Sequence, residues 1–356
     1  MDALARTLLL RCYKNWNMAK DKVDMVIRSL LASETASLRF IAYAVRHVLR
    51  DCRSIGDVQR TVQRLRLGSG LEDAYRAILD KVLQGDESVA KLVKRVFVWL
   101  LGTQRPLTAE ELWEAILIDR KSDGSVDVTV EQRWFDQHRL FQDHCYGMVE
   151  HSNKSGKVVL ADMSVQEFLP NYTGPGNDKP FADRRVRLVT AKAVVSYAIL
   201  DLKDPRGDHP LRGYASATLA DHLLSVGIPD RRLLDLTLQF VGTLLERQHG
   251  LSSPWKFGWK MLSTITSGPF LSVARALNPK WLNADIPAYG CTPLMLAVDH
   301  QDFKAVEALV RTLRVNIKQK SRIPNYRSTE QDKDVKVEPS VYARRKQSQT
   351  IRDLLG

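Results

Sequence analysis

The stretch from Ala288 to Thr312, AYGCTPLMLAVDHQDFKAVEALVRT, constrains the fold most, because it encodes two short amphipathic helices joined by a turn. Thr292 is predicted to cap the first helix, and Pro293 suits its first position, where a missing N–H costs nothing. Gly290 permits the turn before that helix. The apolar residues predicted to face each other across the hairpin are Leu294, Ala297, Val298, Val306, Leu309 and Val310. One such hairpin cannot bury both its flanks, so we expect similar units beside it.

Two neighbouring segments repeat the same pattern incompletely. Downstream, the spacing of a proline and several apolar residues is repeated by Pro339, Val341, Ala343, Ile351, Leu354 and Leu355. The polar segment between the two units, about 321–337, is expected to be a loop or a disordered insert. Upstream, Phe270 to Asn283 has the pattern of a second helix and the finger that follows it. Residues 266–356 are therefore predicted to form a short stack of helical hairpins.

The segment 67–172 has a different order of predicted elements. Apolar periodicity indicates helices from Leu71 and from Ser88 to Leu101, and Thr108 with Glu111 forms a capping box that starts a third helix. A further helix is predicted from Gln132 to Cys145. Two apolar runs on either side of a Ser-Asn-Lys-Ser-Gly turn, residues 147–150 and 157–161, indicate a β-hairpin. This order is typical of a winged helix.

The remaining parts of the chain also have helical patterns. Residues 1–66 contain amphipathic runs, and a Gly/Pro/Asn/Asp-rich edge at 171–180 precedes a helical spacer over 173–265. The fold class expected from the whole sequence is mainly α: a helical N-terminal part, a winged helix with a small hairpin, a helical spacer and a short repeat stack.

Composition limits the class of protein. A hydrophobic fraction of 44% suffices for packed cores, and the four cysteines show no CxxC spacing, so neither a disulfide framework nor a zinc ribbon is indicated. No apolar run reaches the length of a membrane span, and the N-terminus does not resemble a secretory signal. We therefore expect a soluble cytoplasmic protein without a membrane partner.

The net charge of +12 is concentrated at the two ends. Residues 1–66 carry 13 Lys/Arg against 6 Asp/Glu, and residues 313–356 carry 11 against 5. Neither end has the dense basic stripe with interleaved aromatic residues that is typical of a strand-binding groove. The predicted third helix of the winged helix mixes Arg133 and Arg139 with Asp136 and Asp143, which favours packing over phosphate contact. We therefore do not expect nucleic acid as a partner.

Three sequence blocks resemble the large fungal NACHT proteins that carry ankyrin repeats, which are NLR-like (STAND) signalling ATPases. The blocks are GLEDAYRAIL at Gly70–Leu79, WLLGTQRPLTAEEL at Trp99–Leu112 and VLADMSVQEFL at Val159–Leu169. In those proteins they belong to the winged-helix segment that is named after GPI inositol-deacylase, a name that implies no deacylase activity here. The third block has Asp162 where the family usually has histidine.

The resemblance implies structural roles for a set of winged-helix residues: Leu71, Tyr75, Trp99, Pro106, Leu107, Thr108, Leu112, Ser164, Glu167 and Phe168. We predict that Ser164 caps the last helix of this unit and that Glu167 completes a second capping box. In the C-terminal hairpin, TPLMLA at 292–297 resembles the ankyrin consensus, which implies roles for Gly290, Thr292, Pro293, Leu294, Ala297, Val306 and Leu309.

The sequence offers little that would support catalysis. The only Gly-Lys pair, at residues 156–157, lacks the first glycine and the hydroxyl of a P-loop, so we predict no nucleotide cofactor. The candidate metal ligands are His138, Asp143, His144, Cys145 and His151. Their spacing favours packing positions over a shared metal site, so no metal is predicted. No nucleophile elbow is present. No catalytic residue is assigned.

The expected function is thus a non-catalytic protein-interaction scaffold. The resemblance implies that the ankyrin face binds a protein and that the winged helix packs against an NTPase module that this chain lacks. A nucleic-acid-binding winged helix and a hydrolase on the helical spacer are the alternatives.

Overall fold

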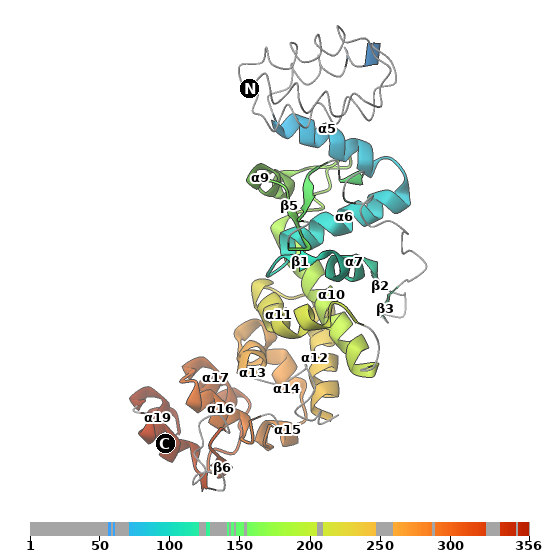
Figure 1. The fold of residues 1–356 in the computed structure, drawn as a ribbon. Helices are drawn as coiled ribbons and strands as arrows, with labels where there is room; N and C mark the ends of the chain where they lie inside the picture. Colours follow the sequence, from blue (N-terminus) through green and yellow to red (C-terminus); the bar gives the residue numbers. More distant parts are fainter. Residues whose placement is uncertain are drawn as a thin grey trace. The chain divides into compact units, whose positions relative to one another are not determined.

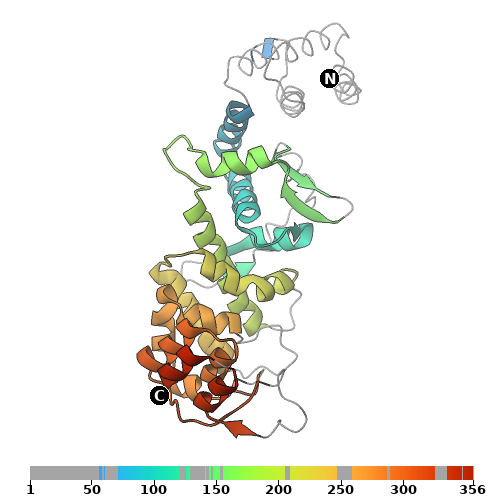
Figure 2. The same ribbon diagram turned by 90° about the vertical axis from the view of Figure 1, so that its left-hand side faces the viewer.

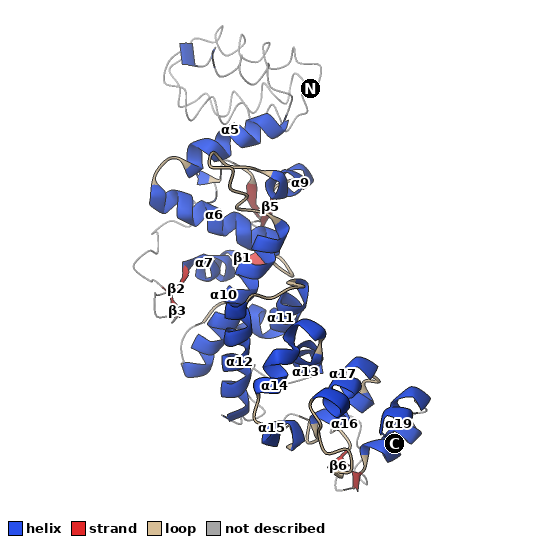
Figure 3. Ribbon diagram, turned by 180° about the vertical axis from the view of Figure 1, so that it is seen from behind, coloured by secondary structure: helices blue, strands red, loops and turns tan. Residues whose placement is uncertain are grey.

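The computed structural model is mainly helical in its described residues, with a few short strands (Figures 1 and 3). These residues are Gly56, Asp57, Arg60, 71–120, 126–128, 141, 144–145, 147–152, 155–204, 209–246, 259–286, 289–324, 335–346 and 348–355. The helices predicted in residues 1–66 and the predicted helix from Gln132 to Cys145 lie largely outside the described residues, and so does the side chain of Leu71. Those predictions remain open.

The chain divides into two compact units. The first comprises residues 1–101, 106–112 and 133–183, and the second comprises 102–105, 113–132 and 184–356.

In its described residues, the first unit contains three helices and a small sheet. The helices are α5 (Leu71–Leu83), α6 (Glu87–Gly102) and α9 (Met163–Asn171). Helix α6 buries its apolar face through residues such as Val93, Val96 and Phe97. Helix α5 carries Glu72 and Asp73 in its first turn, where carboxylates favour the helix dipole. The helices predicted from the spacing of apolar residues are confirmed here.

The predicted hairpin is confirmed and has a third strand beside it. The strands are β1 (Leu107–Thr108), β4 (Val149–His151) and β5 (Lys157–Leu160), in the antiparallel order β1-β5-β4. Figure 2 shows the hairpin of β4 and β5 in green. Gly156 at φ 64° makes the turn before β5, a backbone conformation that favours glycine. The sequence did not indicate β1, because a two-residue strand leaves no alternation to detect.

The capping box at Thr108 is confirmed. The Thr108 N–H donates to Glu111 Oε2 at 2.9 Å, and the Glu111 N–H donates to Thr108 Oγ1 at 3.2 Å. Helix α7 therefore begins immediately after it and spans Ala109–Leu117. A short antiparallel pair that the sequence did not indicate follows, β2 (Ile118–Arg120) and β3 (Val126–Val128).

The second unit is a succession of helices. They are α10 (Asp183–Lys203), α11 (Arg212–Ser225), α12 (Arg231–Glu246), α13 (Trp259–Thr266), η3 (Gly268–Phe270), α14 (Leu271–Ala276), α15 (Pro279–Asn283), α16 (Pro293–Asp299), α17 (Phe303–Glu307), η4 (Ala308–Thr312), α18 (Pro339–Arg345) and α19 (Gln349–Leu355). The segment 173–265, predicted to be a helical spacer, contains α10, α11 and α12, so its helical character is confirmed.

The helices from α11 onward pack as stacked pairs. Helix α11 contacts α13, α13 contacts α16, and α16 contacts α18, which makes one row. In a second row α12 contacts α14, and α17 contacts α19. The hairpin α16–α17 thus has a neighbour on each side, as the unburied flanks of a single hairpin require.

Candidate functional site

The local predictions for the hairpin α16–α17 are confirmed. Thr292 is the N-cap of α16, since its Oγ1 accepts from the Met295 N–H at 3.3 Å, and Pro293 occupies the first turn. Gly290 has φ 64° in the turn closed by the bridge between Ile286 and Cys291. Of the six residues predicted to face each other across this hairpin, Val310 is half-buried and the other five are buried: Leu294, Ala297, Val298, Val306 and Leu309.

The turn between α16 and α17 needs no glycine. Gln301 adopts φ 55°, and Asp302 caps α17 by accepting from the Ala305 N–H at 3.0 Å. Two contacts fix this turn on α13. The rings of His300 and Trp259 stack with centroids 4.4 Å apart, and Ser263 Oγ donates to Asp302 Oδ2 at 2.9 Å.

A buried charge joins this hairpin to the next one. The Asp299 carboxylate accepts from the Tyr342 hydroxyl at 2.8 Å and lies 2.7 Å from Lys346 Nζ. Because Asp299 is on α16 and the other two residues are on or next to α18, the cluster ties two helix pairs together. The sequence did not indicate it, since the three residues are far apart along the chain.

The insert between the two pairs is ordered at both ends. Strands β6 (Ser321–Arg322) and β7 (Lys336–Val337) form an antiparallel ladder, so the expectation of a loop or disorder is wrong for these residues. Backbone pairing explains the order, together with the Ser321 hydroxyl, which accepts from the Thr292 N–H at 2.9 Å. Residues 325–334 lie outside the described part of the chain.

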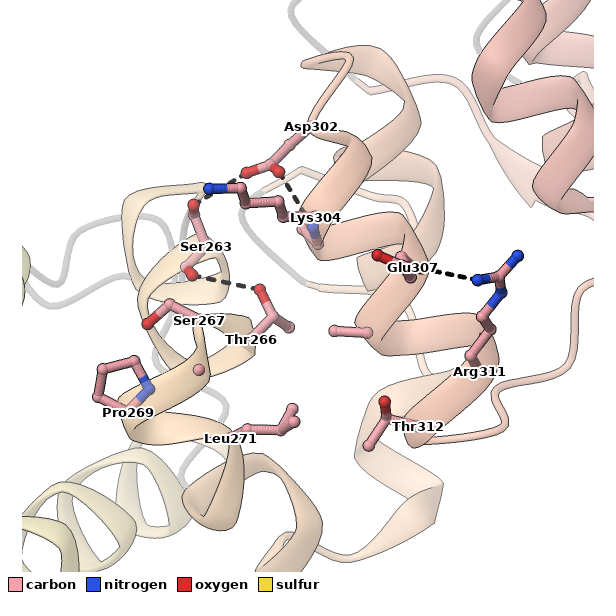
Figure 4. Close-up of a pocket in the computed structure, with 13 residues that line it drawn as sticks. Ser263, Thr266, Ser267, Pro269, Leu271, Asp302, Lys304, Glu307, Arg311 and Thr312 are labelled. Atoms are coloured by element: carbon pink, nitrogen blue, oxygen red, sulfur yellow. Dashed lines mark hydrogen bonds and ion pairs between the residues drawn. The ribbon is translucent and has the colours of Figure 1, made fainter.

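A groove of about 670 Å³ opens between the end of α13 with η3 and the helices α17 and η4 (Figure 4). Its lining is dominated by small and hydroxyl-bearing residues, with no aromatic side chain. The lining residues are Ser263, Thr266, Ser267, Gly268, Pro269, Leu271, Asp302, Lys304, Ala305, Glu307, Ala308, Arg311 and Thr312.

The polar groups of the groove are largely engaged with the protein itself. Thr266 Oγ1 donates to the Leu262 carbonyl at 2.8 Å, and Ser267 Oγ donates to the Thr264 carbonyl at 2.6 Å. Arg311 pairs with Glu307 at 2.8 Å on the exposed side (Figure 4). These groups are not aligned as nucleophile, base and oxyanion donors.

In the first unit, the structure brings together Tyr75, Ser164 and Phe168 from the set implied by the resemblance. The Tyr75 and Ser164 hydroxyls lie 2.9 Å apart, and the Tyr75 and Phe168 ring centroids are separated by 5.4 Å. The sequence patterns did not indicate Tyr172. Its ring packs against that of Phe168 in a tilted arrangement, and its hydroxyl donates to Asp80 Oδ1 at 2.6 Å. The cluster is an aromatic core.

The prediction that Ser164 caps the last helix of this unit is wrong. Asp162 is the N-cap, and its carboxylate accepts from the Ser164 N–H at 2.8 Å. A carboxylate at the N-cap accepts hydrogen bonds from the free N–H groups of the first turn, and its negative charge is favoured by the helix dipole. Because Ser164 turns to Tyr75 instead, the predicted box with Glu167 does not form, and Glu167 is exposed.

The other described residues of that set differ in exposure. Trp99, Leu107 and Leu112 are buried, and Pro106 is exposed just before β1. Thr108 contributes to the capping box. None of them lines the groove.

A buried charged cluster in the second unit was also missed. Glu114 accepts from the Tyr197 hydroxyl at 2.9 Å, and Asp201 accepts from Arg212 Nε at 2.7 Å. The ring of His209 lies between these carboxylates, 3.8 Å from Glu114 Oε1 and 3.7 Å from Asp201 Oδ1. Burial and the neighbouring carboxylates raise the pKa of Tyr197. The cluster cross-links α7, α10 and α11 within the unit.

His222 lies in a second buried network. The Gln104 N–H donates to the Tyr214 hydroxyl at 3.0 Å, and that hydroxyl is hydrogen-bonded to His222 Nε2 at 2.7 Å. His222 Nδ1 is buried without a hydrogen-bond partner among the described residues. Burial lowers the pKa of His222 to about 4, so the ring is neutral at pH 7.

Of the histidines, acids and cysteine weighed for metal, His138 and Asp143 lie outside the described residues. Cys145 is fully buried, and burial raises its pKa. In the described part of the chain, no group of three or more His, Cys, Asp and Glu is placed to hold a metal. None of the helices described there has both the length and the apolar character of a membrane span.

Comparisons of the chain with protein-family models, curated proteins and solved structures found no match.

Proposed function

We propose that this chain is a non-catalytic protein-interaction scaffold that holds a segment of a partner protein in the groove between α13 with η3 and α17 with η4. The observation that carries this proposal is the groove, which lies on a stack of helix pairs. Repeat stacks use extended surfaces to bind proteins. Gly268, Ala305 and Ala308 are small residues, so they leave room in the groove for a partner's side chains. The lining has no aromatic residue, which disfavours a small planar ligand.

We infer that the stack is of the ankyrin type. The Asn316 N–H donates to Asn283 Oδ1, and these asparagines are 33 residues apart, which is the length of one ankyrin repeat. Proline occupies the first turn of both α16 and α18. Both features support an array of similar units that follow one another along the chain.

We further propose that the first unit is a winged helix of the NACHT-associated kind. The sequence blocks at Gly70–Leu79, Trp99–Leu112 and Val159–Leu169 support this, as does the β1-β5-β4 sheet, in which the hairpin pairs with a strand before α7. In such a protein the unit would contact an NTPase module supplied by another chain or segment.

Groove binding can be tested by selecting ligands from a displayed random-peptide library on the purified chain. A selected peptide is then titrated against the wild type, Gly268→Tyr and Gly242→Tyr. A side chain at either glycine meets nothing within 4 Å, but only Gly268 lines the groove. We expect Gly268→Tyr to weaken binding at least about tenfold and Gly242→Tyr to leave it unchanged.

Equal binding to all three proteins would place the ligand elsewhere and contradict the groove. Steeply salt-dependent affinity for DNA would favour the nucleic-acid alternative. Hydrolysis of ATP or an ester at an enzymatic rate would overturn a non-catalytic function.

A further inference from the structure

The ladder of β6 and β7 presents a row of positive charge. Lys318, Lys320, Arg322 and Lys336 are all exposed and surround the paired strands; we call them the basic ladder. They are four of the 11 Lys/Arg residues at 313–356, and none of them lines the groove.

The backbone places most of these cations on one face. Along residues 320–323, exposed and buried positions alternate, with Ser321 and Ile323 buried and Lys320 and Arg322 exposed. Alternation of this kind puts Lys320 and Arg322 on the same side, about 6.6 Å apart along the strand. Arg322 is the direct cross-strand partner of Lys336.

Two cations directly opposite each other on an antiparallel ladder destabilise it. No residue of the basic ladder forms an ion pair with a described residue, and the described positions 316–324 and 335–337 contain no acidic residue. Glu338 is two residues beyond Lys336, but it forms no ion pair with it. Within the described part of the chain no carboxylate relieves this repulsion; Glu330, Asp332 and Asp334, in the segment that joins the two strands, lie outside it. A bound anion would relieve the repulsion.

The strands that carry these charges are held firmly on the stack. Ser321 bonds to the Thr292 N–H, and Gln319 Nε2 donates to the Asn283 carbonyl at 2.6 Å. The Asn316 N–H donates to Asn283 Oδ1 at 2.8 Å. The backbone that carries these cations therefore loses little freedom when a ligand binds, which favours recognition.

We propose that the basic ladder is a docking surface for an extended acidic segment of a partner protein. Alternate side chains of an extended peptide recur at the same spacing of about 6.6 Å as Lys320 and Arg322. Single-strand nucleic-acid sites combine cations with aromatic side chains on which the bases stack, and the described residues 316–324 and 335–338 contain no aromatic residue. This surface is additional to the groove of the proposed function. Its positive charge indicates that the partner segment it binds is acidic.

The test uses the purified full chain and a fluorescein-labelled peptide of alternating glutamate and serine, with a glutamine-serine peptide as the ligand control. Fluorescence anisotropy compares the wild type with Arg322→Gln/Lys336→Gln. The matched control, Arg275→Gln/Lys280→Gln, removes the same charge from two exposed positions of the same unit. Circular dichroism checks that all three proteins are folded, and Arg322→Glu/Lys336→Glu provides a second, stronger variant.

We expect the ladder variant to weaken binding of the glutamate peptide about five- to tenfold and the control variant to weaken it less than about twofold. Equal loss in both variants, or no binding to the wild type, would overturn the proposal. Tighter binding of oligothymidylate or of phosphatidylserine-containing vesicles, lost in the same ladder variant, would also overturn it in favour of nucleic acid or membrane. The Gly268→Tyr variant should retain the glutamate peptide, so a failure here is distinguishable from a failure of the groove.

Discussion

The two units differ in how they bury polar side chains. In the first unit the buried contacts centre on neutral groups, such as the Tyr75 and Ser164 hydroxyls beside the Phe168 ring, and the one buried carboxylate among its described residues, Glu111, bonds within its own capping box. In the second unit the buried groups include the carboxylates of Glu114, Asp201 and Asp299. A buried carboxylate is costly unless its partner is in place, so the second unit depends on specific pairs between helices whereas the first depends on apolar packing.

The largest expected effect is in the aromatic core of the first unit. Phe168→Ala should lower the free energy of unfolding by about 4 kcal/mol, because it leaves a cavity beside Tyr75 and Tyr172. Met163→Ala on the same helix is the control, since Met163 is 65% exposed and should cost less than about 0.5 kcal/mol. Urea unfolding measures both. Equal costs would mean that α9 is not anchored through Phe168.

Asp299→Ala should lower the free energy of unfolding by about 3 kcal/mol, because it leaves Tyr342 and Lys346 without their shared acceptor. Asp235, exposed on α12, supplies the matched control as Asp235→Ala, with little expected change. Urea is the denaturant of choice, since it leaves ionic strength constant. If Asp299→Ala lowered the free energy of unfolding only slightly, the proposed dependence of the second unit on buried charged pairs would be contradicted.

Acid should destabilise the second unit through His222. The pKa of His222 is lowered to about 4 by burial, from an ordinary value of 6.5, so its contribution is complete above pH 6.5 and is lost as the pH falls toward 4. The loss should approach about 2 to 3 kcal/mol. His222→Gln keeps a partner for Tyr214 but cannot titrate, so its stability should fall less over that range. If the free energy of unfolding of both proteins fell equally with pH, the role assigned to His222 would be contradicted.

Thr108→Ala should cost about 1 kcal/mol through loss of the capping box with Glu111. Thr350→Ala, at an exposed position of α19, should be nearly neutral. Amide exchange should localise the Thr108→Ala effect to the start of α7. An effect spread evenly over the unit would show that the cap is not the cause.

The smallest effect should be a gain. Arg322→Glu replaces a like-charged pair with an opposite-charged pair facing Lys336, and should raise stability by about 0.5 kcal/mol in low salt. Arg275→Glu has no opposed lysine on a ladder and serves as the control. A loss of stability in Arg322→Glu would contradict the repulsion assigned to this pair.

The parts of the fold that the sequence predicted are those decided within a few residues. Thr108 with Glu111 and Thr292 with Met295 are bonds between positions three residues apart, and apolar periodicity marked the helices. Asp162 shows the limit of such reasoning. Two polar residues near one helix start compete for the cap, and the choice depends on Tyr75, far away along the chain.

The groove and the charged clusters could not be predicted for the same reason. Ser263 and Asp302 are 39 residues apart, and Asp299 and Tyr342 are 43 apart. Only the packing of one helix pair on the next brings them together. The strands β6 and β7 were missed because two-residue strands in a polar segment have no apolar alternation.

The most direct test of the scaffold proposal is amide hydrogen exchange of the full chain with and without a selected peptide, followed by mass spectrometry. Binding in the groove predicts that protection is concentrated in the two segments that form its walls, residues 263–271 and 302–312. Protection confined to the first unit, or no protection at saturating peptide, would contradict it.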